Sequence, residues 1–257
     1  MGKFDGVLFC SDWDGTLFIG DKVPENTIKA IDYFKSEGGH FSITSGRGSS
    51  YLKEMSHFVM PNTYCICYGG ALVTDIFTGE TILKDFVDRD AFDVVDALLA
   101  TGAKTASINL MYENEEIIRY NEQEFLRVKD RIEGNIYKVT LSAASGEDGE
   151  IYAKAARNMQ NEKYTLARSF TSYIEIMKSK NTKGNSARLL KEKLGSKLLL
   201  GIGDYENDLP LFEKVDVSFA VSNAVPELKR AANYILSKSV SEGAIEEAIA
   251  ILEEKIL

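Results

Sequence analysis

The N-terminal third of the chain alternates short apolar runs with longer segments in which apolar residues recur at helical spacing. Ile28, Ile31 and Phe34, for example, share one face of a segment that predicts a helix. The pattern predicts, in order, a strand over residues 7–11, a helix over 24–37, a strand over 40–44, a helix over 47–58 and a strand over 64–68. Strands that alternate with helices indicate an α/β fold with a mostly parallel sheet, covered by helices on both faces.

The pattern changes at about residue 81, where strand-like segments become longer and come in pairs. Predicted strands cover residues 80–87, 104–112, 115–120, 135–144, 164–170 and 172–177, with helices near 90–100, 121–132 and 147–159. We expect residues 81–178 to form a separate α+β domain that is inserted in the first domain.

From residue 179 the alternation of helices and strands returns. Predicted helices cover residues 182–194, 209–214 and 226–232, and predicted strands cover 198–202, 217–221 and 234–236. A closing helix carries Ile245, Ala248 and Ile249 at helical spacing, which is typical of a face packed on the core. Residues 1–80 and 179–257 therefore predict one α/β domain built from two distant parts of the chain.

Composition narrows the class of protein. The chain has 257 residues, of which 44% are hydrophobic, so a substantial core is expected. The net charge of −9 argues against a nucleic-acid or anionic-membrane partner. Because no apolar run approaches the roughly 20 residues that span a bilayer, and no basic-then-apolar leader precedes Phe4, we expect a cytoplasmic protein. Cys10, Cys65 and Cys67 lie in apolar runs and are expected to be buried free thiols.

Polar residues gather where the predicted strands end. Asp12 and Asp14 follow the first strand, Ser45 and Gly46 follow the second, and the sequence GDYEND follows strand 198–202. In open parallel sheets, ligands bind beyond the carboxyl ends of the strands, where the strand order reverses. We therefore expect these segments to meet at one crevice.

The residue types at this crevice favour a metal ion. Asp12 and Asp14 are close enough to raise each other's pKa unless a cation lies between them. Oxygen ligands without histidine or cysteine favour Mg²⁺, and Asp204 and Asp208 offer further carboxylates. Taken alone, an Asp-x-Asp pair also fits a solvated turn or a helix cap. A helix-loop-helix calcium loop is excluded because Leu17 stands where that loop requires glycine.

Phosphate is the natural ligand beside such a metal. Ser45 and the amides of Gly46 and Arg47 are predicted to open a helix, where free N–H groups attract an anion, and Lys183 adds a positive charge. Singly, Ser45 also fits a helix cap and Lys183 a solvated surface lysine.

Together these residues predict a phosphoryl-transfer site. Asp12 would attack phosphorus and form an aspartyl-phosphate, while Asp14 would act as general acid and base. Mg²⁺ would be held by Asp12, the main-chain carbonyl of Asp14 and Asp204. Ser45 and Lys183 would hold the phosphoryl oxygens.

Four motifs in this order resemble the haloacid dehalogenase (HAD) superfamily. They are DWDGTL at residues 12–17, TSGR at 44–47, Lys183-Gly184 and GDYEND at 203–208. An insert after the third core strand, together with the sequence at 221–236, is similar to the Cof-type phosphatases of this superfamily. The resemblance implies a Rossmann-like core with an inserted α+β cap, and Mg²⁺-dependent phosphatase activity on small phosphorylated metabolites.

The resemblance also implies roles for further residues. It makes Asn207 a phosphate ligand, Asp208 an outer partner of the metal site and Asn223 a neighbour of the pocket. The chain departs from the family pattern at Ser45, where threonine is usual, and at Gly69, where asparagine is usual before Gly-Ala.

Two other functions share this fold and remain open at the level of sequence. A sugar phosphomutase would need cap cations that grip a second phosphate, and Arg119, Arg127 and Arg131 are candidates. The other alternative is a non-catalytic sensor of phosphorylated metabolites. In each case we expect the cap to select the group attached to the phosphate.

Overall fold

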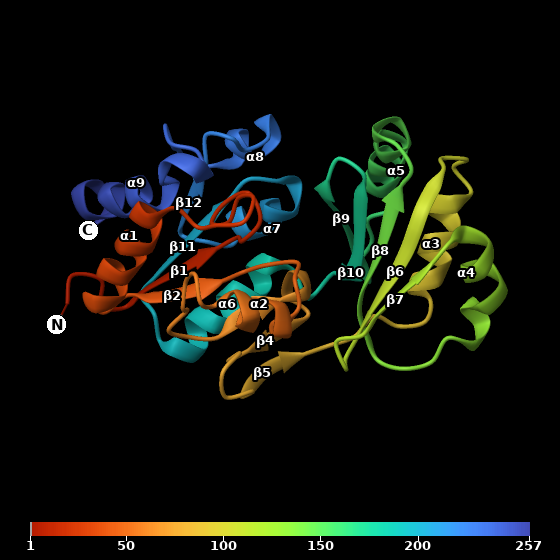
Figure 1. Ribbon diagram of the computed structural model, residues 1–257, viewed down its shortest axis with the longest axis horizontal. Coiled ribbons are helices and arrows are strands. Elements are labelled where there is room, and N and C mark those ends of the chain that lie inside the picture. Colours follow the sequence, from red (N-terminus) through yellow and green to blue (C-terminus); the bar gives the residue numbers. More distant parts are fainter. Residues whose placement is uncertain (1) are drawn as a thin grey trace. The chain divides into compact units, whose positions relative to one another are not determined.

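The structure, a computed structural model, describes residues 2–257 and divides the chain into two units (Figure 1). The first unit contains the chain up to Leu83 and again from Lys183 to Leu257, and the second contains Lys84–Thr182. The second unit begins three residues after the start of the predicted insert, 81–178, and ends four residues after its end. Within residues 2–257, no helix has the length and apolar character needed to cross a membrane.

Five parallel strands form the sheet of the first unit, which confirms the predicted α/β architecture. They are β1 (Val7–Ser11), β2 (His40–Ile43), β11 (Leu198–Gly203), β12 (Val217–Ala220) and β13 (Tyr234–Ile235), in the spatial order β13-β12-β11-β1-β2. The strand order reverses beside β1, because β2 lies on one side of it and β11 on the other. Ser11 pairs with both Ile43 and Ile202, so the loops after these three strands leave the sheet at the same level.

Helices bury this sheet on both faces. They are α1 (Glu25–Ser36), α2 (Ser49–Met55), α6 (Lys183–Leu194), α7 (Leu209–Phe212), α8 (Pro226–Ala231) and α9 (Ala244–Ile251), the last continued by a π-helical turn (Leu252–Ile256). Every residue of β1 is buried, as expected for a central parallel strand. The Phe9 ring lies 5.9 Å from Phe34 of α1 and 6.2 Å from Phe219 of β12, measured between centroids. These contacts anchor β1 to its neighbours.

The three cysteines are free and buried, as predicted. Burial raises the pKa of Cys10 and of Cys65 to about 12, so both thiols stay protonated near neutral pH. They act as small apolar core residues.

The predicted strand at 64–68 is present but shorter, and it does not join the parallel sheet as a full strand. The strand observed, β3 (Cys65–Cys67), pairs antiparallel with β4 (Leu72–Thr74), and β5 (Thr81–Lys84) completes a three-stranded sheet. The chain turns back because Tyr68, Gly69 and Gly70 all have positive φ, at 50°, 71° and 123°. Thr44 still forms a parallel bridge with Ile66, so β3 remains attached to the end of β2.

The second unit is an antiparallel sheet with helices on one face, as expected for an α+β insert. Its strands are β6 (Thr105–Tyr112), β7 (Ile117–Tyr120), β8 (Ile136–Ala143), β9 (Tyr164–Phe170) and β10 (Tyr173–Lys178), in the order β7-β6-β8-β10-β9. Its helices are α3 (Ala91–Leu99), α4 (Glu122–Val128) and α5 (Gly146–Asn158) (Figure 1). Phe92, Phe125 and Tyr152 from these helices join one apolar core with the sheet.

Candidate active site

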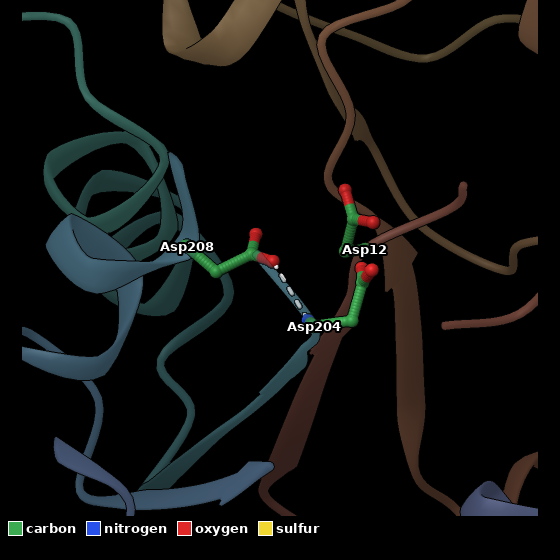
Figure 2. A group of neighbouring side chains, drawn as sticks. All are labelled: Asp12, Asp204 and Asp208. Atoms are coloured by element: carbon green, nitrogen blue, oxygen red, sulfur yellow. Dashed lines mark hydrogen bonds between the residues drawn. The ribbon is translucent and has the colours of Figure 1, made fainter. Parts of the chain in front are cut away.

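Three aspartates meet beyond the carboxyl ends of β1 and β11. Carboxylate oxygens of Asp12, Asp204 and Asp208 all lie within 4.8 Å of one another. Figure 2 shows the Asp12 and Asp204 side chains close together and the Asp208 carboxylate directed toward the Asp204 backbone. Asp12 and Asp208 are buried and Asp204 is partly buried. The predicted convergence of segments that are almost 200 residues apart is therefore present.

Lys183 contacts two of these three aspartates. Its Nζ is 2.5 Å from Asp12 Oδ1 and 2.6 Å from Asp208 Oδ1, and only 2% of the residue is exposed. Lys183 is the first residue of α6, and the second residue, Gly184, allows this helix to lie against α7. A Cβ at Gly184 would be 1.9 Å from the carbonyl oxygen of Pro210, which no side chain permits. The Lys-Gly pair thus places the ammonium group among the carboxylates.

The electrostatics of the cluster favour a bound cation. Burial raises the pKa of Asp12 well above its usual range, and the charges of Asp208 and Asp204 add to this effect against that of Lys183. Burial and the charge of Asp208 raise the pKa of Asp204 to about 7. Burial alone would lower the pKa of Lys183, but the charges of its two aspartate partners raise it. One lysine therefore does not balance three carboxylates near neutral pH.

Asp208 differs from the other two because its oxygens already have partners. Oδ1 accepts from Lys183, and Oδ2 accepts from the backbone N–H groups of Asp204 and Tyr205 at 3.0 and 3.2 Å. This carboxylate holds the loop after β11 in place. That geometry agrees with the predicted position behind the candidate metal ligands.

The Asp14 side chain lies outside the cluster of three. Its carboxylate forms two hydrogen bonds with the guanidinium of Arg47, from Nε and Nη2, both at 2.9 Å. The guanidinium lies 4.8 Å from the centre of the Tyr51 ring. Sequence reasoning used only the amide of Arg47 and missed this ion pair. No local sequence pattern signals it, because the pairing of β1 with β2 that brings Arg47 beside Asp14 is a tertiary contact.

Two backbone hydrogen bonds hold Ser45, one through its N–H group and one through its carbonyl. Its N–H donates to the carbonyl of Ile66 at 2.8 Å, and its carbonyl accepts from the N–H of Gly69 at 2.9 Å. Gly69 can make this bond because it adopts a φ of 71°, which favours glycine. The glycine that replaces the family's usual asparagine therefore has a structural part in holding Ser45.

The amides after Ser45 do not open a helix, contrary to prediction. Helix α2 begins at Ser49, so Gly46 and Arg47 lie in the preceding loop. The Arg47 N–H donates to Ser45 Oγ at 3.1 Å. A local side-chain acceptor competes with helix formation here, which explains the later helix start.

The loop after β1 contacts Asp204, a candidate metal ligand, through a hydrogen bond and a close approach of its backbone. Gly15 has a φ of 83°, and a Cβ there would lie 2.4 Å from Asp204 Oδ2. Thr16 Oγ1 donates to Asp204 Oδ1 at 3.0 Å. Sequence reasoning did not assign a function to Thr16, although it lies two residues after Asp14 in the same motif.

The remaining predicted residues lie on neighbouring loops. Asn223 Nδ2 donates to the Gly15 carbonyl at 2.9 Å, and its Oδ1 accepts from the Val240 N–H at 2.9 Å. Asn207 lies in the 3₁₀ turn Glu206–Asp208, between the two aspartates of its motif. Asn223 thus holds the loop that carries Asp14.

Residues 9–249 match the family model of the haloacid dehalogenase-like hydrolases. The chain belongs to this family. It is 28% identical to a "Putative phosphatase" of Streptococcus pyogenes serotype M6 over 94% of this chain and 96% of the relative. It is also 28% identical to the "Putative phosphatase YxeH" of Bacillus subtilis, with the same coverage. A "Phosphoglycolate phosphatase" of Staphylothermus marinus is 27% identical over 96% of this chain and 98% of the relative.

Solved structures share the fold of this hydrolase. A haloacid dehalogenase-like hydrolase from B. subtilis superposes with a TM-score of 0.77 at 19% identity, covering 97% of this chain and 99% of that one. A HAD subclass IIB sugar phosphatase superposes with a TM-score of 0.72 at 18% identity, covering 95% and 97%. The family resemblance and the core-plus-insert fold predicted from sequence are confirmed.

The donor set of this hydrolase fits a hard divalent cation. The candidate ligands are carboxylate and carbonyl oxygens, which suit Mg²⁺ better than softer metals. Asp12 and Asp204 carry raised pKa values that a nearby cation would lower again. The glycine at position 15 leaves the Asp204 carboxylate uncovered, where any larger residue would contact it.

Proposed function

We propose that this hydrolase is a Mg²⁺-dependent phosphatase of small phosphorylated metabolites, such as sugar phosphates, that acts through an aspartyl-phosphate. The observation that carries the proposal is the meeting of Asp12, Lys183, Asp204 and Asp208 at the carboxyl ends of β1 and β11. A buried nucleophile beside a lysine and further carboxylates suits attack on a phosphate ester. The names of the full-length relatives, all phosphatases, support the same reaction.

The metal site would use three groups of the chain. Asp12, Asp204 and the main-chain carbonyl of Asp14 would hold Mg²⁺, and Asp208 would orient the Asp204 loop behind it. When bound, Mg²⁺ supplies positive charge that reduces repulsion between the phosphate and the carboxylates.

Two aspartates perform the chemistry. A carboxylate oxygen of Asp12 forms a bond to phosphorus as the bond from phosphorus to the leaving oxygen breaks, and Asp14 gives its proton to that oxygen. In the second half, water attacks the aspartyl-phosphate, Asp14 takes the proton of this water, and inorganic phosphate leaves with Asp12 restored. Arg47 would hold the Asp14 carboxylate by two hydrogen bonds after it has given its proton to the leaving oxygen and before it takes the proton of the water.

Four residues would bind the phosphoryl oxygens. Lys183 contributes charge, while Ser45, Gly46 and Asn207 contribute hydrogen-bond donors. Ser45 suits this role because its Oγ accepts from Arg47 N–H, so the hydroxyl proton remains to be donated. The inserted unit, Lys84–Thr182, would select the leaving group.

The test measures phosphate release from a metabolite panel and an aryl phosphate, with Mg²⁺ and with EDTA. We expect chelation to abolish release, and Asp12→Asn to do the same while exposed Asp21→Asn has no effect. An acid-quenched reaction analysed by mass spectrometry should carry phosphate on the peptide that contains Asp12. Activity that survives in EDTA or in Asp12→Asn contradicts the mechanism.

The same assay separates the alternatives. Conversion of a hexose 1-phosphate to its isomer without free phosphate would identify a phosphomutase. Tight binding of phosphorylated metabolites without any turnover would identify a sensor.

A further inference from the structure

The two candidate phosphate ligands Ser45 and Lys183 lie on segments of the first unit that are far apart in the sequence. Ser45 lies in the loop after β2, and Lys183 begins α6. Among residues 2–257, no hydrogen bond joins the two residues directly. A phosphoryl group held by both needs a third segment that fixes the distance between them, because an error of about 1 Å in a positioning group lowers turnover about a hundredfold.

The turn Tyr68–Gly70, here called the glycine turn, contacts the loop that carries Ser45. The Tyr68 N–H donates to the carbonyl of Arg47 at 2.9 Å, and the Gly69 N–H donates to the carbonyl of Ser45 at 2.9 Å. The turn is therefore bonded to this loop at two points, one of them at the candidate ligand itself.

The backbone of the glycine turn has an uncommon conformation. Tyr68 has a φ of 50°, although it is not a glycine, and it is only 3% exposed. Gly69 and Gly70, which follow it, have positive φ as well and are also buried. A tyrosine in the left-handed region costs conformational energy, and such strain persists only where surrounding contacts hold the backbone in place. The glycine turn therefore needs support from its neighbours.

Ser186 of α6 supplies that support from the side opposite Ser45. Its Oγ donates to the carbonyl of Gly70 at 2.8 Å, and the residue is 1% exposed. Ser186 lies three residues after Lys183, so the two residues share one face of the helix. Serine is a weaker helix former than alanine, so the hydroxyl is better explained by its bond to the turn than by the helix itself.

Two hydrogen bonds and one peptide unit thus connect Ser45 to α6. Gly69 binds the Ser45 carbonyl, and the next residue, Gly70, accepts from the Ser186 hydroxyl. All four residues are buried, and the peptide between the two glycines is planar and stiff. This connection leaves the turn little freedom to move toward or away from the helix.

The helix is the fixed side of this connection. Lys183 is held by Asp12 and Asp208, and Gly184 packs against the backbone of Pro210 in α7. The glycine turn and the loop with Ser45 belong to the other side. Loss of the Ser186 hydroxyl should therefore displace Ser45 more than Lys183.

We propose that Ser186 is a positioning residue for phosphate binding, which joins α6 to the glycine turn and thereby fixes Ser45 relative to Lys183. This inference rests on the proposed phosphatase function. It adds a residue that acts only through other residues, by way of the Gly70 carbonyl.

The key variant is Ser186→Ala in the full-length chain with Mg²⁺, and the probe is inorganic phosphate. Its Kd is measured by isothermal titration calorimetry, and its inhibition constant in the hydrolysis of p-nitrophenyl phosphate, both well below Tm. Each constant should rise about three- to tenfold, as expected for one lost hydrogen bond between neutral groups. Ser186→Cys keeps the size of the side chain and a weak donor, so its constants should lie between those of the wild type and the alanine variant.

A double-mutant cycle tests whether Ser186 acts through Ser45. Ser45→Ala should itself weaken phosphate binding, because it removes a donor. In that background, Ser186→Ala should raise the Kd by a smaller factor than in the wild type, since the hydroxyl that it positions is absent. A residue that only stabilises the fold would raise the Kd by the same factor in both backgrounds.

The matched control is Ser218→Ala. Ser218 lies on β12, is 1% exposed, and donates from its Oγ to Asn233 Oδ1 at 2.9 Å. This variant should lower Tm and leave the Kd of phosphate unchanged. If it raises the Kd as much as Ser186→Ala does, loss of any buried serine hydroxyl is sufficient, and the assignment of Ser186 is overturned.

The remaining outcomes separate this inference from the proposed function. Wild-type constants in Ser186→Ala, or equal factors in the two backgrounds of the cycle, would overturn the role of Ser186 and leave the phosphatase intact. A wild-type protein that binds phosphate but releases it from no ester would remove the proposed function. The calorimetric Kd would then still decide whether Ser186 positions the phosphate ligands.

Discussion

Gly184 offers a quantitative test of how Lys183 is positioned. An alanine Cβ at this position would lie 1.9 Å from Pro210 O, 2.7 Å from Pro210 C and 2.8 Å from Lys214 Cγ. The nearest atoms are backbone, so α6 and α7 must separate by at least about 1 Å to remove the overlap. Overpacking of this kind costs about 1–3 kcal/mol. For a protein of this size that corresponds to a decrease of about 2–12 °C in Tm.

The same displacement reaches the active site. Lys183 Nζ is 2.5 Å from Asp12 Oδ1, and a shift of about 1 Å in a positioning group lowers turnover by about a hundredfold. Thermal unfolding and steady-state phosphate release would measure both effects. Gly146→Ala is the matched control, because its Cβ, at the start of α5, would meet no atom within 4 Å. If Gly184→Ala retains wild-type Tm and kcat, backbone contact between α6 and α7 is not what holds Lys183.

Three further results are expected. Thr16→Val removes the hydroxyl that donates to Asp204 Oδ1, so the Mg²⁺ concentration for half-maximal activity should rise about 10- to 100-fold in a Mg²⁺ titration. The pKa of Asp204 is raised from 3.8 to about 7, so the folded metal-free protein keeps a proton that the unfolded chain has lost. In EDTA this group lowers stability as pH rises from 4 to 7, and the Tm of Asp204→Asn relative to that of the wild type should therefore increase over this range. Arg47→Ala breaks a half-exposed ion pair with Asp14 and should change the free energy of unfolding by less than about 1 kcal/mol. It should lower kcat/KM for alkyl phosphates more than for p-nitrophenyl phosphate, because only the alkoxide leaving group needs the proton of Asp14. Equal losses for the two substrates would argue against that role of Asp14.

Much of the fold was predictable because apolar periodicity reports local burial. The run at 7–11 predicted a buried central strand, and all residues of β1 are buried. The alternation of helices and strands on either side of residues 81–178 predicted a parallel sheet assembled from distant segments, which the order β13-β12-β11-β1-β2 confirms. Periodicity failed at residues 64–68, because the direction of the chain there depends on three consecutive positive φ angles that hydropathy does not encode.

The sequence predicted which residues make up the candidate site better than it predicted how their side chains are directed. Placing polar residues at strand ends was enough to bring Asp12, Asp204 and Asp208 together, since parallel strands end at one edge of the sheet. The direction of the Asp14 side chain was not predictable. It depends on Arg47, whose position follows from the pairing of β1 with β2.

By itself, the sequence determined which residues are available for chemistry and which strands they follow. It could do so because the periodicity of buried residues and the position of a residue at the end of a strand are local properties. Only the tertiary structure decided which of these groups pair with one another. Lys183 contacts two carboxylates because α6 lies against α7 at a glycine. Asp14 pairs with Arg47, outside the cluster, because β1 lies beside β2. Contacts of this kind join residues that are distant in sequence, so no local pattern contains them.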